Sequence, residues 1–314
     1  MKLSILFRFH QNIPLCKNRL QMLRHYNPGI GIYGLYGGSQ EQSSIFEREL
    51  SPLLDDFFCP PVDKDPKWKW HNGDLLINEW FLCRGQFLDW DTIVSVHWDM
   101  IILGSISDIF SELKENQILL GGVRPIEEIS SHWFWVRKDQ PSNYAKFNFF
   151  KQSLLTHHDY NGPFLACHLI VACLPRNFLE LYSKIEMPDG RDEYRLPTYA
   201  KVFGIPFSTE SNKFQSWWYS APGARKIPWK KRVLVPTGPI LSHSLVFILY
   251  QFYRNGSRIF HPFVYIFPNK PSDFFSFIFD RQRLSNLKKK LAMNWKRINN
   301  KLKIILGCLT KRST

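Results

Sequence analysis

The chain has 314 residues and a formal net charge of +14, with 44% hydrophobic and 16% aromatic residues. This composition excludes a chain that is disordered throughout, and it leaves enough apolar material for one large α/β domain or two modest ones. Six cysteines are scattered without a CxxC pair, which argues against a disulfide framework and against a zinc site. The apolar run at the start is too short for a signal peptide, and no later apolar stretch is long enough to cross a bilayer. We therefore expect a reduced, cytoplasmic protein.

The first part of the chain predicts a β-α-β-α order. "LSILFRF" at 3–9 is typical of a strand, and a helix fits 15–26 before "NPG" ends it. "IGIYGLYGG" at 30–38 predicts a second strand, and Ser39 with Gln42 resembles a capping box that opens a helix through about residue 54. Alternating strands and helices favour a parallel sheet with crossover helices.

The middle of the chain continues this alternation. A loop rich in proline and charge covers 59–70, and Asn72 is expected to cap a helix over 73–84 whose apolar side chains face the sheet. "TIVSVHWDMIIL" at 92–103 predicts a strand buried on both faces. The remaining expected elements are a helix near 107–115, strands at 117–123, 132–136 and 164–173, and helices at 176–185 and 194–204.

The positive charge is concentrated at the end of the chain. Residues 281–312 hold eleven of the 41 Lys and Arg residues and no Asp or Glu, so the other 30 basic residues nearly balance 27 acidic ones. Leucines, isoleucines and Trp295 recur there every three or four residues, which predicts a basic amphipathic helix. We expect a main domain over 1–275 and this helical tail over 276–314. We rank an anionic membrane surface as its first partner, packing on protein second and nucleic acid third.

Polar or small residues follow three of the expected strands. The first strand ends in Arg8 and His10, the second in two glycines, and the third contains His97 and Asp99. Ligands of open α/β sheets bind beyond the carboxyl ends of the strands, so these positions are candidates for a binding site. An unpaired buried carboxylate is unfavourable, so Asp99 must have a donor, a metal ion or solvent beside it. The alternative is that Asp99 caps the following turn while His97 packs in the core.

The order of these motifs resembles a known family. A first strand is followed by "HQNIPLCKNRLQMLRHYNPGIGIYGLYGG", then by "GDLLINEWF", an apolar strand ending in "HWDM", "DEYRLPTYAKVFGIPF" and "RIFHPF". Over residues 3–267 this is similar to the nucleotide-sugar-dependent glycosyltransferases of the GT-A type, particularly the family-2-like group. The resemblance implies a Rossmann-like α/β fold with a mixed, mainly parallel central sheet. It also implies transfer of a sugar from a nucleoside diphosphate donor to a hydroxyl of a glycan, lipid or saccharide.

The family holds a divalent ion on the donor with an Asp-x-Asp motif, where this chain has His97-Trp98-Asp99. The resemblance therefore implies Asp99 as a ligand of Mn²⁺ or Mg²⁺, with His97 and the late His261 completing the set. Mn²⁺ tolerates imidazole, whereas Mg²⁺ prefers oxygen. A histidine held by other contacts in a loop is the alternative for His261.

Two acidic residues open the expected helix of "DEYRLPTYAKVFG". An inverting transferase needs a base for the acceptor hydroxyl. The resemblance assigns that position to Glu193, with Asp192 as the second candidate. Either residue could instead only cap its helix.

Four further residues are candidates for donor binding: Arg8, His10, Asp74 and Trp98. Asp74 could equally be a first-turn helix carboxylate, and Arg8 could pair with a nearby acid. The tryptophan-rich runs at 68–70, 132–135 and 216–219 could stack on sugar faces or only pack. Because His97 replaces a carboxylate, the alternative function is a catalytically degenerate scaffold that binds a nucleotide-sugar or glycan at the inner membrane surface.

Overall fold

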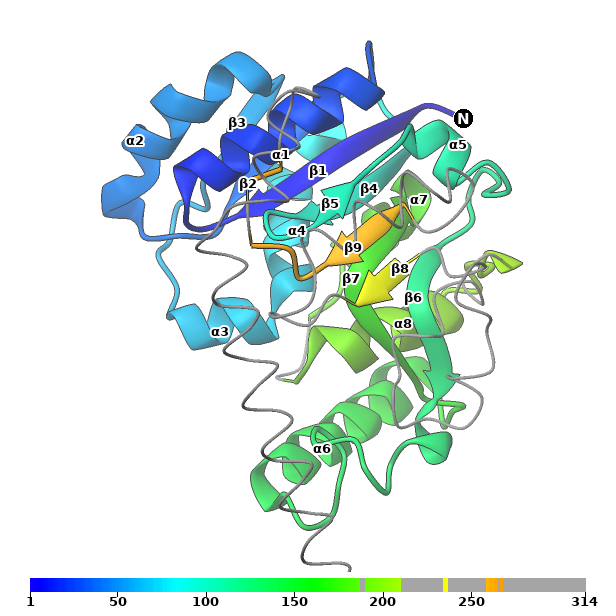
Figure 1. Cartoon of the computed structure of the whole chain (residues 1–314). Helices are drawn as coiled ribbons and strands as arrows, with labels where there is room; N and C mark the ends of the chain where they lie inside the picture. The colour runs from blue at the N-terminus through cyan, green and yellow to red at the C-terminus, as the bar shows by residue number, and fades with distance from the viewer. Residues whose placement is uncertain (187–189, 210–233, 237–257, 265, 268–314) are drawn as a thin grey trace, which may run out of the picture.

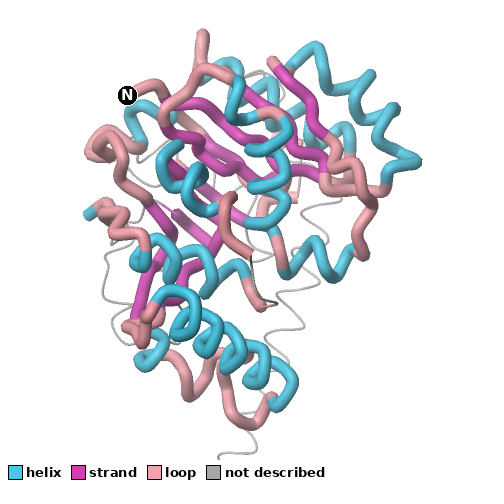
Figure 2. The backbone as a smooth tube through the Cα atoms, turned by 180° about the vertical axis from the view of Figure 1, so that it is seen from behind, coloured by secondary structure: helices cyan, strands magenta, loops and turns pink. Residues whose placement is uncertain are grey.

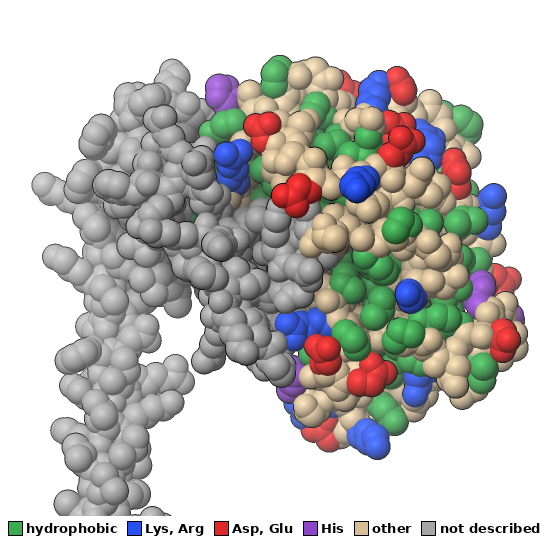
Figure 3. Space-filling view, turned by 90° about the vertical axis from the view of Figure 1, so that its right-hand side faces the viewer, with side chains coloured by type: hydrophobic (Ala, Val, Ile, Leu, Met, Phe, Trp, Pro, Cys, Tyr) green, Lys and Arg blue, Asp and Glu red, His purple; other side chains and the backbone are tan. Residues whose placement is uncertain are grey.

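The computed structural model describes residues 1–186, 190–209, 234–236, 258–264 and 266–267. The expected basic helix over 281–312 and the tryptophans of 216–219 lie outside this part of the chain. No helix in the described ranges is long and apolar enough to span a membrane. On the face shown in Figure 3, acidic and basic side chains of the described residues are interspersed.

Two sheets form the fold (Figure 1). The main sheet has the order β3-β2-β1-β4-β7-β6, and a small sheet has the order β5-β9-β8. The strands of the main sheet are β1 (Leu3–Phe9), β2 (Ile32–Tyr36), β3 (Asp56–Phe58), β4 (Thr92–His97), β6 (Leu119–Pro125) and β7 (Leu165–Pro175). The small sheet consists of β5 (Ile101–Ile102), β8 (Leu234–Pro236) and β9 (Ile259–His261).

The main sheet is mixed. β1 is parallel to both β2 and β4, and β2 is parallel to β3, whereas β7 runs antiparallel to β4 and to β6. The predicted α/β fold with a mixed, mainly parallel central sheet is therefore confirmed. The three carboxyl ends of β1, β2 and β4 meet at one edge of the sheet.

Helices cover both faces of the main sheet, and Figure 2 shows several of them lying across the strands. The helices are α1 (Ile13–Tyr26), α2 (Gln40–Leu50), α3 (Pro66–His71), α4 (Gly73–Cys83), α5 (Ile106–Ile109), α6 (Pro141–His158), α7 (Arg176–Tyr182) and α8 (Asp192–Val202). Short 3₁₀ helices lie at η1 (Ser51–Leu53), η2 (Gly85–Phe87) and η3 (Ile126–Glu128). Ile5 and Phe7 of β1 join a core with α1, α2 and α5, whereas Leu6 joins the opposite core with α4, α6, α7 and α8. This follows from the alternation of side chains along a strand.

Several expectations about single elements are wrong. Residues 132–136 form turns instead of a strand, and the expected loop over 59–70 contains the start of α3. The side chains of Ser39 and Asn72 make no capping hydrogen bond, although α2 and α4 begin beside them. The 18-residue helix α6 was not predicted.

The stretch 92–103 is divided between the two sheets. β4 ends at His97, the N–H of Met100 donates to the carbonyl of His97 at 2.9 Å, and β5 begins at Ile101. Asp99 therefore lies in a tight turn and not within a strand. β5 pairs antiparallel with β9, where Ile101 lies opposite Phe260. This pairing brings a segment from the far end of the described chain beside the turn.

Candidate active site

A cavity of about 750 Å³ lies at the carboxyl ends of β1, β2 and β4, and residues of α3 also line it. This is the position expected for a ligand of an open α/β sheet. Most of the predicted site residues line it. They are Arg8, His10, His97, Trp98, Asp99, Asp192, Glu193 and His261.

One wall of the cavity is built by the register of the parallel strands. Arg8 of β1 lies directly opposite His97 of β4, so their side chains project from the same face of the sheet. Nη1 of Arg8 is 3.1 Å from Nε2 of His97, and the same ring nitrogen is 3.1 Å from the carbonyl oxygen of Leu169. Among the described residues no acid lies within ion-pair distance of Arg8. Its neighbour is thus a histidine, not the acid that the sequence left open as an alternative.

The turn after β4 brings Asp99 against β9. The N–H of Phe263 donates to the carbonyl of Asp99 at 2.6 Å, which fixes the two segments to each other. Nε2 of His261 lies 3.2 Å from Oδ1 of Asp99, and the rings of His261 and His97 are 6.0 Å apart between centroids. His97, Asp99 and His261 each offer one ligand atom within 4.8 Å of the others.

The protonation states of this wall suit metal ligands. Burial, together with the charge of Arg8, lowers the pKa of His97 to about 3, so its imidazole is neutral at pH 7. Burial alone would raise the pKa of Asp99, but the hydrogen bond and charge of His261 outweigh it and lower that pKa. A neutral imidazole and an ionised carboxylate are the forms that bind a divalent cation.

The donor set of two imidazoles and one carboxylate fits Mn²⁺ better than Mg²⁺. The geometry adds one restriction, because Nε2 of His97 is already in contact with Arg8. A cation would therefore be held first by Asp99 and His261, with His97 as a third ligand.

The opposite wall comes from the start of α8 and from β7. Oε1 of Glu193 is 3.3 Å from Nδ1 of His168, and Oε2 is 3.4 Å from Nη2 of Arg191. Oδ2 of Asp192 accepts the backbone N–H of Gly73 at 3.2 Å, and Oδ1 accepts the N–H of Glu193 at 2.9 Å.

These two neighbouring acids differ in proton affinity. Burial and the negative charge of Asp74 raise the pKa of Asp192 to about 7. Burial also acts to raise the pKa of Glu193, but hydrogen bonding and the charges of His168 and Arg191 overcome it and lower that pKa. Near pH 7 this wall therefore contains one ionised carboxylate, Glu193, and one that is partly protonated, Asp192.

Asp74 lies below the cavity and does not line it. Its side chain is fully buried, with Oδ1 2.6 Å from Nη2 of Arg195 and Oδ2 2.8 Å from Nε of the same guanidinium. The hydroxyl of Tyr182 donates to Oδ2 as well. As a residue of the first turn of α4, Asp74 occupies the structural position that the sequence offered as the alternative to donor binding.

Gly73 allows the walls to meet. A methyl group at Gly73 would overlap Nη2 of Arg8 and lie 3.0 Å from Oδ2 of Asp192. A larger residue at this position would therefore displace the guanidinium of Arg8 from its place beside the start of α4.

His10 and Trp98 stand together at the cavity, with ring centroids 5.3 Å apart in an edge-to-face arrangement. The backbone N–H of Trp98 donates to the carbonyl of Arg8 at 2.9 Å. Burial lowers the pKa of His10. His10 and Trp98 thus offer flat rings near Arg8.

Several lining residues were not predicted. Lys69 is held by the carbonyl of Gly38 and by Asp63, both at 2.7 Å, and it faces the cavity together with His168 and Arg191. In the sequence His168 is an isolated polar residue in the apolar strand "LACHLIVAC", which is the same signal that singled out Asp99. Arg191 carries no comparable sequence signal.

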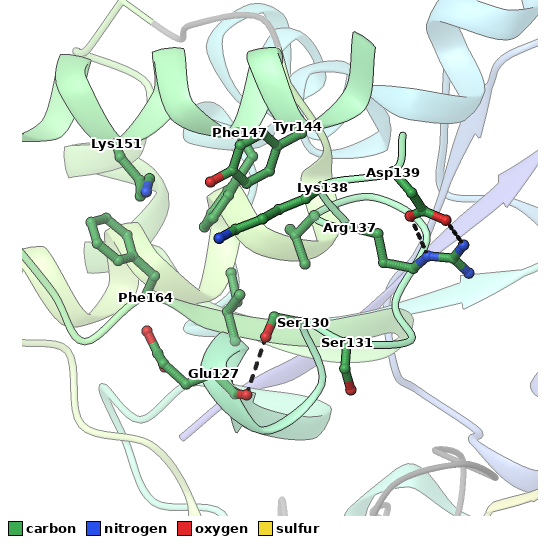
Figure 4. Close-up of a pocket in the computed structure, with 12 residues that line it drawn as sticks. Glu127, Ser130, Ser131, Arg137, Lys138, Asp139, Tyr144, Phe147, Lys151 and Phe164 are labelled. Carbon is green, nitrogen blue, oxygen red and sulfur yellow. Dashed lines mark hydrogen bonds and ion pairs between the residues drawn. The ribbon is translucent and has the colours of Figure 1, made fainter. Parts of the chain in front are cut away.

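Two other cavities lie close by. One of about 540 Å³ lies between α6 and residues 126–139, where Lys138, Tyr144 and Phe147 surround it (Figure 4). Arg137 there is paired with Asp139, and none of the predicted site residues lines it. The other, of about 1020 Å³, lies between α3 and the start of α6 and shares Trp70 and Trp135 with the central cavity.

The chain matches no protein-family model, and no curated protein matches its sequence. Among solved structures it is similar to the bifunctional glycosyltransferase WbbM, at 12% identity and a TM-score of 0.42 over 91% of this chain, and it spans about half (49%) of that chain's length. It is similar to an active-site mutant of LgtC, at 12% identity and a TM-score of 0.38 over 85% of this chain and 89% of that one. It is also similar to the galactosyltransferase LgtC in complex with donor and acceptor sugar analogues, at 10% identity and a TM-score of 0.38 over 91% and 95%. A fold does not determine an activity, which depends on the residues of the site.

Proposed function

We propose that the protein transfers a sugar from a nucleoside diphosphate donor to a hydroxyl acceptor in the central cavity, as the sequence resemblance to GT-A transferases implies. One observation carries the proposal. A cationic side chain and three residues that could hold a metal ion gather on one wall, at the carboxyl ends of parallel strands, and two acidic residues line the other wall. An inverting sugar transfer needs both, because the leaving group is anionic and the acceptor hydroxyl must lose a proton to a base.

The leaving group of such a reaction is a nucleoside diphosphate, whose developing negative charge must be stabilised. Arg8 supplies a half-buried cation beside His97, and Lys69, which is paired with Asp63, adds a second cationic side chain at the cavity. A divalent cation on Asp99 and His261 would act as a Lewis acid toward the diphosphate oxygens when bound. His10 and Trp98 offer ring faces and edges for the base or ribose of the donor.

Glu193 is the proposed base for the acceptor hydroxyl. Its pKa is lowered, so the carboxylate is ionised at neutral pH, and His168 and Arg191 fix its orientation. Asp192 has the proton affinity that general-base catalysis favours, since its pKa lies near 7, but it is almost completely buried. The two assignments predict different pH profiles, because only catalysis by Asp192 would give an inflection near pH 7.

The first test measures donor binding by the full chain. UDP-, GDP- and dTDP-sugars are screened for a rise in melting temperature with and without Mn²⁺, because a ligand that binds only the native state stabilises it. We expect one donor to raise the melting temperature by several degrees in the presence of Mn²⁺, and Asp99→Ala to abolish the shift. Asp108→Ala, at an exposed position of α5, is the matched control. A screen in which no donor shifts the melting temperature would overturn the proposal.

The second test separates an enzyme from a degenerate scaffold. Donor hydrolysis or transfer by the wild-type chain, lost in Glu193→Gln with donor binding retained, supports catalysis. Donor binding without any turnover under the same conditions would support the scaffold instead. That outcome would give weight to His97, whose ring contacts Arg8 where the family has a carboxylate.

A further inference from the structure

Two tryptophan-rich runs that are far apart in the sequence meet at the cavity of about 1020 Å³ between α3 and the start of α6. Trp70 comes from α3, and Trp135 comes from the turns between β6 and α6. Their ring centroids are 5.7 Å apart, and the ring of Phe134 lies 5.1 Å from that of Trp135. We call Trp68, Trp70, Phe134 and Trp135, which all line the cavity of about 1020 Å³, the aromatic platform.

The platform is exposed as a binding surface would be. Trp70 is 63% exposed and Phe134 is 48% exposed, although large aromatic side chains gain most when they are covered. Polar side chains stand beside the rings, including Gln140, Ser142 and Asn143 near the start of α6. Rings with amides and hydroxyls around them suit a ligand that has apolar faces and many hydroxyl groups.

Arg191 joins the platform to the candidate active site. Its guanidinium lies 3.8 Å from the ring centroid of Trp135 and 4.6 Å from that of Trp70, so it contacts both rings. The same group contacts Glu193 at 3.4 Å. A ligand that covers the two tryptophans would therefore lie next to the proposed base.

We propose that the aromatic platform binds an oligosaccharide and that this is the acceptor whose hydroxyl reaches Glu193. The acceptor assignment rests on the proposed function, whereas saccharide binding itself does not. The cavity volume is at the upper end of the range for small-ligand sites, so there is room for more than one sugar ring. The ionisable groups that line it are Asp65, Lys67, His71, Lys146 and Arg195, and Arg195 is already paired with the buried Asp74. The remaining charges are few and include an acid, which favours a neutral saccharide over a nucleic acid strand.

The test uses the full chain, labelled with a fluorophore, on an array of immobilised glycans, followed by titration of the best binder as a free oligosaccharide. Phe134→Ala is the principal variant, because Phe134 lines only the cavity of the platform. We expect its saccharide affinity to fall about tenfold, in line with the apolar area that stacking would cover. Trp70→Ala should show a similar loss. Phe87→Ala is the control, because Phe87 is 78% exposed and lines none of these cavities.

The donor-induced shift in melting temperature, measured on the same variants, tests the transferase function separately from saccharide binding by the platform. Phe134→Ala should keep the donor shift of the wild type while losing saccharide affinity. If a donor raises the melting temperature but no glycan on the array binds, or all variants bind the saccharide equally, the platform inference is wrong and the transferase proposal is unaffected. If the platform binds a saccharide but no donor shifts the melting temperature, saccharide binding is supported and the proposed transferase function is refuted. Binding of single-stranded RNA that weakens steeply with salt, in place of saccharide binding, would also overturn the inference.

Discussion

The buried pair of Asp74 and Arg195 allows a sharp test, because the sequence offered Asp74 both as a donor ligand and as a structural carboxylate. Both side chains are fully buried, and Arg195 contacts both carboxylate oxygens, with Tyr182 donating to one of them. Asp74→Asn keeps the shape of the side chain but removes the charge that balances the guanidinium. Breaking a buried ion pair in this way destabilises a protein by about 3–5 kcal/mol.

This loss is large against a total stability of about 5–15 kcal/mol. With a denaturant slope of about 2 kcal/mol/M, the midpoint of urea unfolding should fall by roughly 2 M. The measurement is tryptophan fluorescence during urea denaturation. Asp139→Asn is the control, because Asp139 also pairs with an arginine through both oxygens but on the surface, where such pairs contribute little. Its midpoint should match the wild type.

The result that refutes this reasoning is specific. If Asp74→Asn unfolds at the wild-type urea concentration but loses the donor-induced melting shift, the carboxylate acts on the ligand and not on Arg195. The structural assignment of Asp74 would then be wrong.

Two further predictions concern titration and metal binding. The native state holds a proton on Asp192 up to about pH 7, whereas an unfolded aspartate releases it near its ordinary value of 3.8. The free energy of unfolding should therefore fall as the pH rises from about 4 to 7, by a few kcal/mol at most, and Asp192→Asn should flatten this dependence in urea titrations at each pH. A wild-type chain with constant stability over this range would contradict the raised pKa. Separately, His261→Ala should weaken Mn²⁺ binding at least about tenfold in an electron paramagnetic resonance titration, with the exposed His157→Ala as control. Equal Mn²⁺ affinity in the two variants would show that His261 is not a ligand of the cation.

The sequence predicted most elements that carry a regular apolar pattern. β1, β2, α1, α4 and β7 all lie close to their expected bounds, because alternation or three-to-four spacing marks a buried face. The stretch 92–103 was harder, since both β4 and β5 are buried and the apolar run continues through the turn that separates them. Hydrophobicity alone does not reveal a change of sheet.

Two errors have a common cause in the aromatic residues. Residues 132–136 have the composition of a strand, but their backbone forms turns. Trp133 packs in the core, whereas Phe134 is exposed. In α6 the buried positions are Phe147, Phe150 and Leu154, which do follow helical spacing, but polar residues and histidines surround them and weaken the pattern. Aromatic content drew attention to 132–136 without indicating its backbone, and it gave no clear sign of α6.

The sequence brought forward Asp99 and His261, which the structure places 3.2 Å apart, from their positions at the end of an apolar strand and before a proline. It could not reveal that Arg191 contacts both Trp70 and Trp135, because the three residues come from separate segments and no local pattern predicts their contact. The contact of Arg8 with His97 likewise depends on strand register, which a single sequence does not define.

The pairing of β5 with β9 has a consequence for the order of assembly. All six strands of the main sheet lie before residue 176, whereas His261 reaches Asp99 only when a segment more than 80 residues later returns to the turn. Contacts of such long sequence separation form late, and chains fold largely in the order in which they are synthesised. A nascent chain could thus form its main sheet while still on the ribosome, whereas the proposed cation site would be assembled only after β9 had emerged.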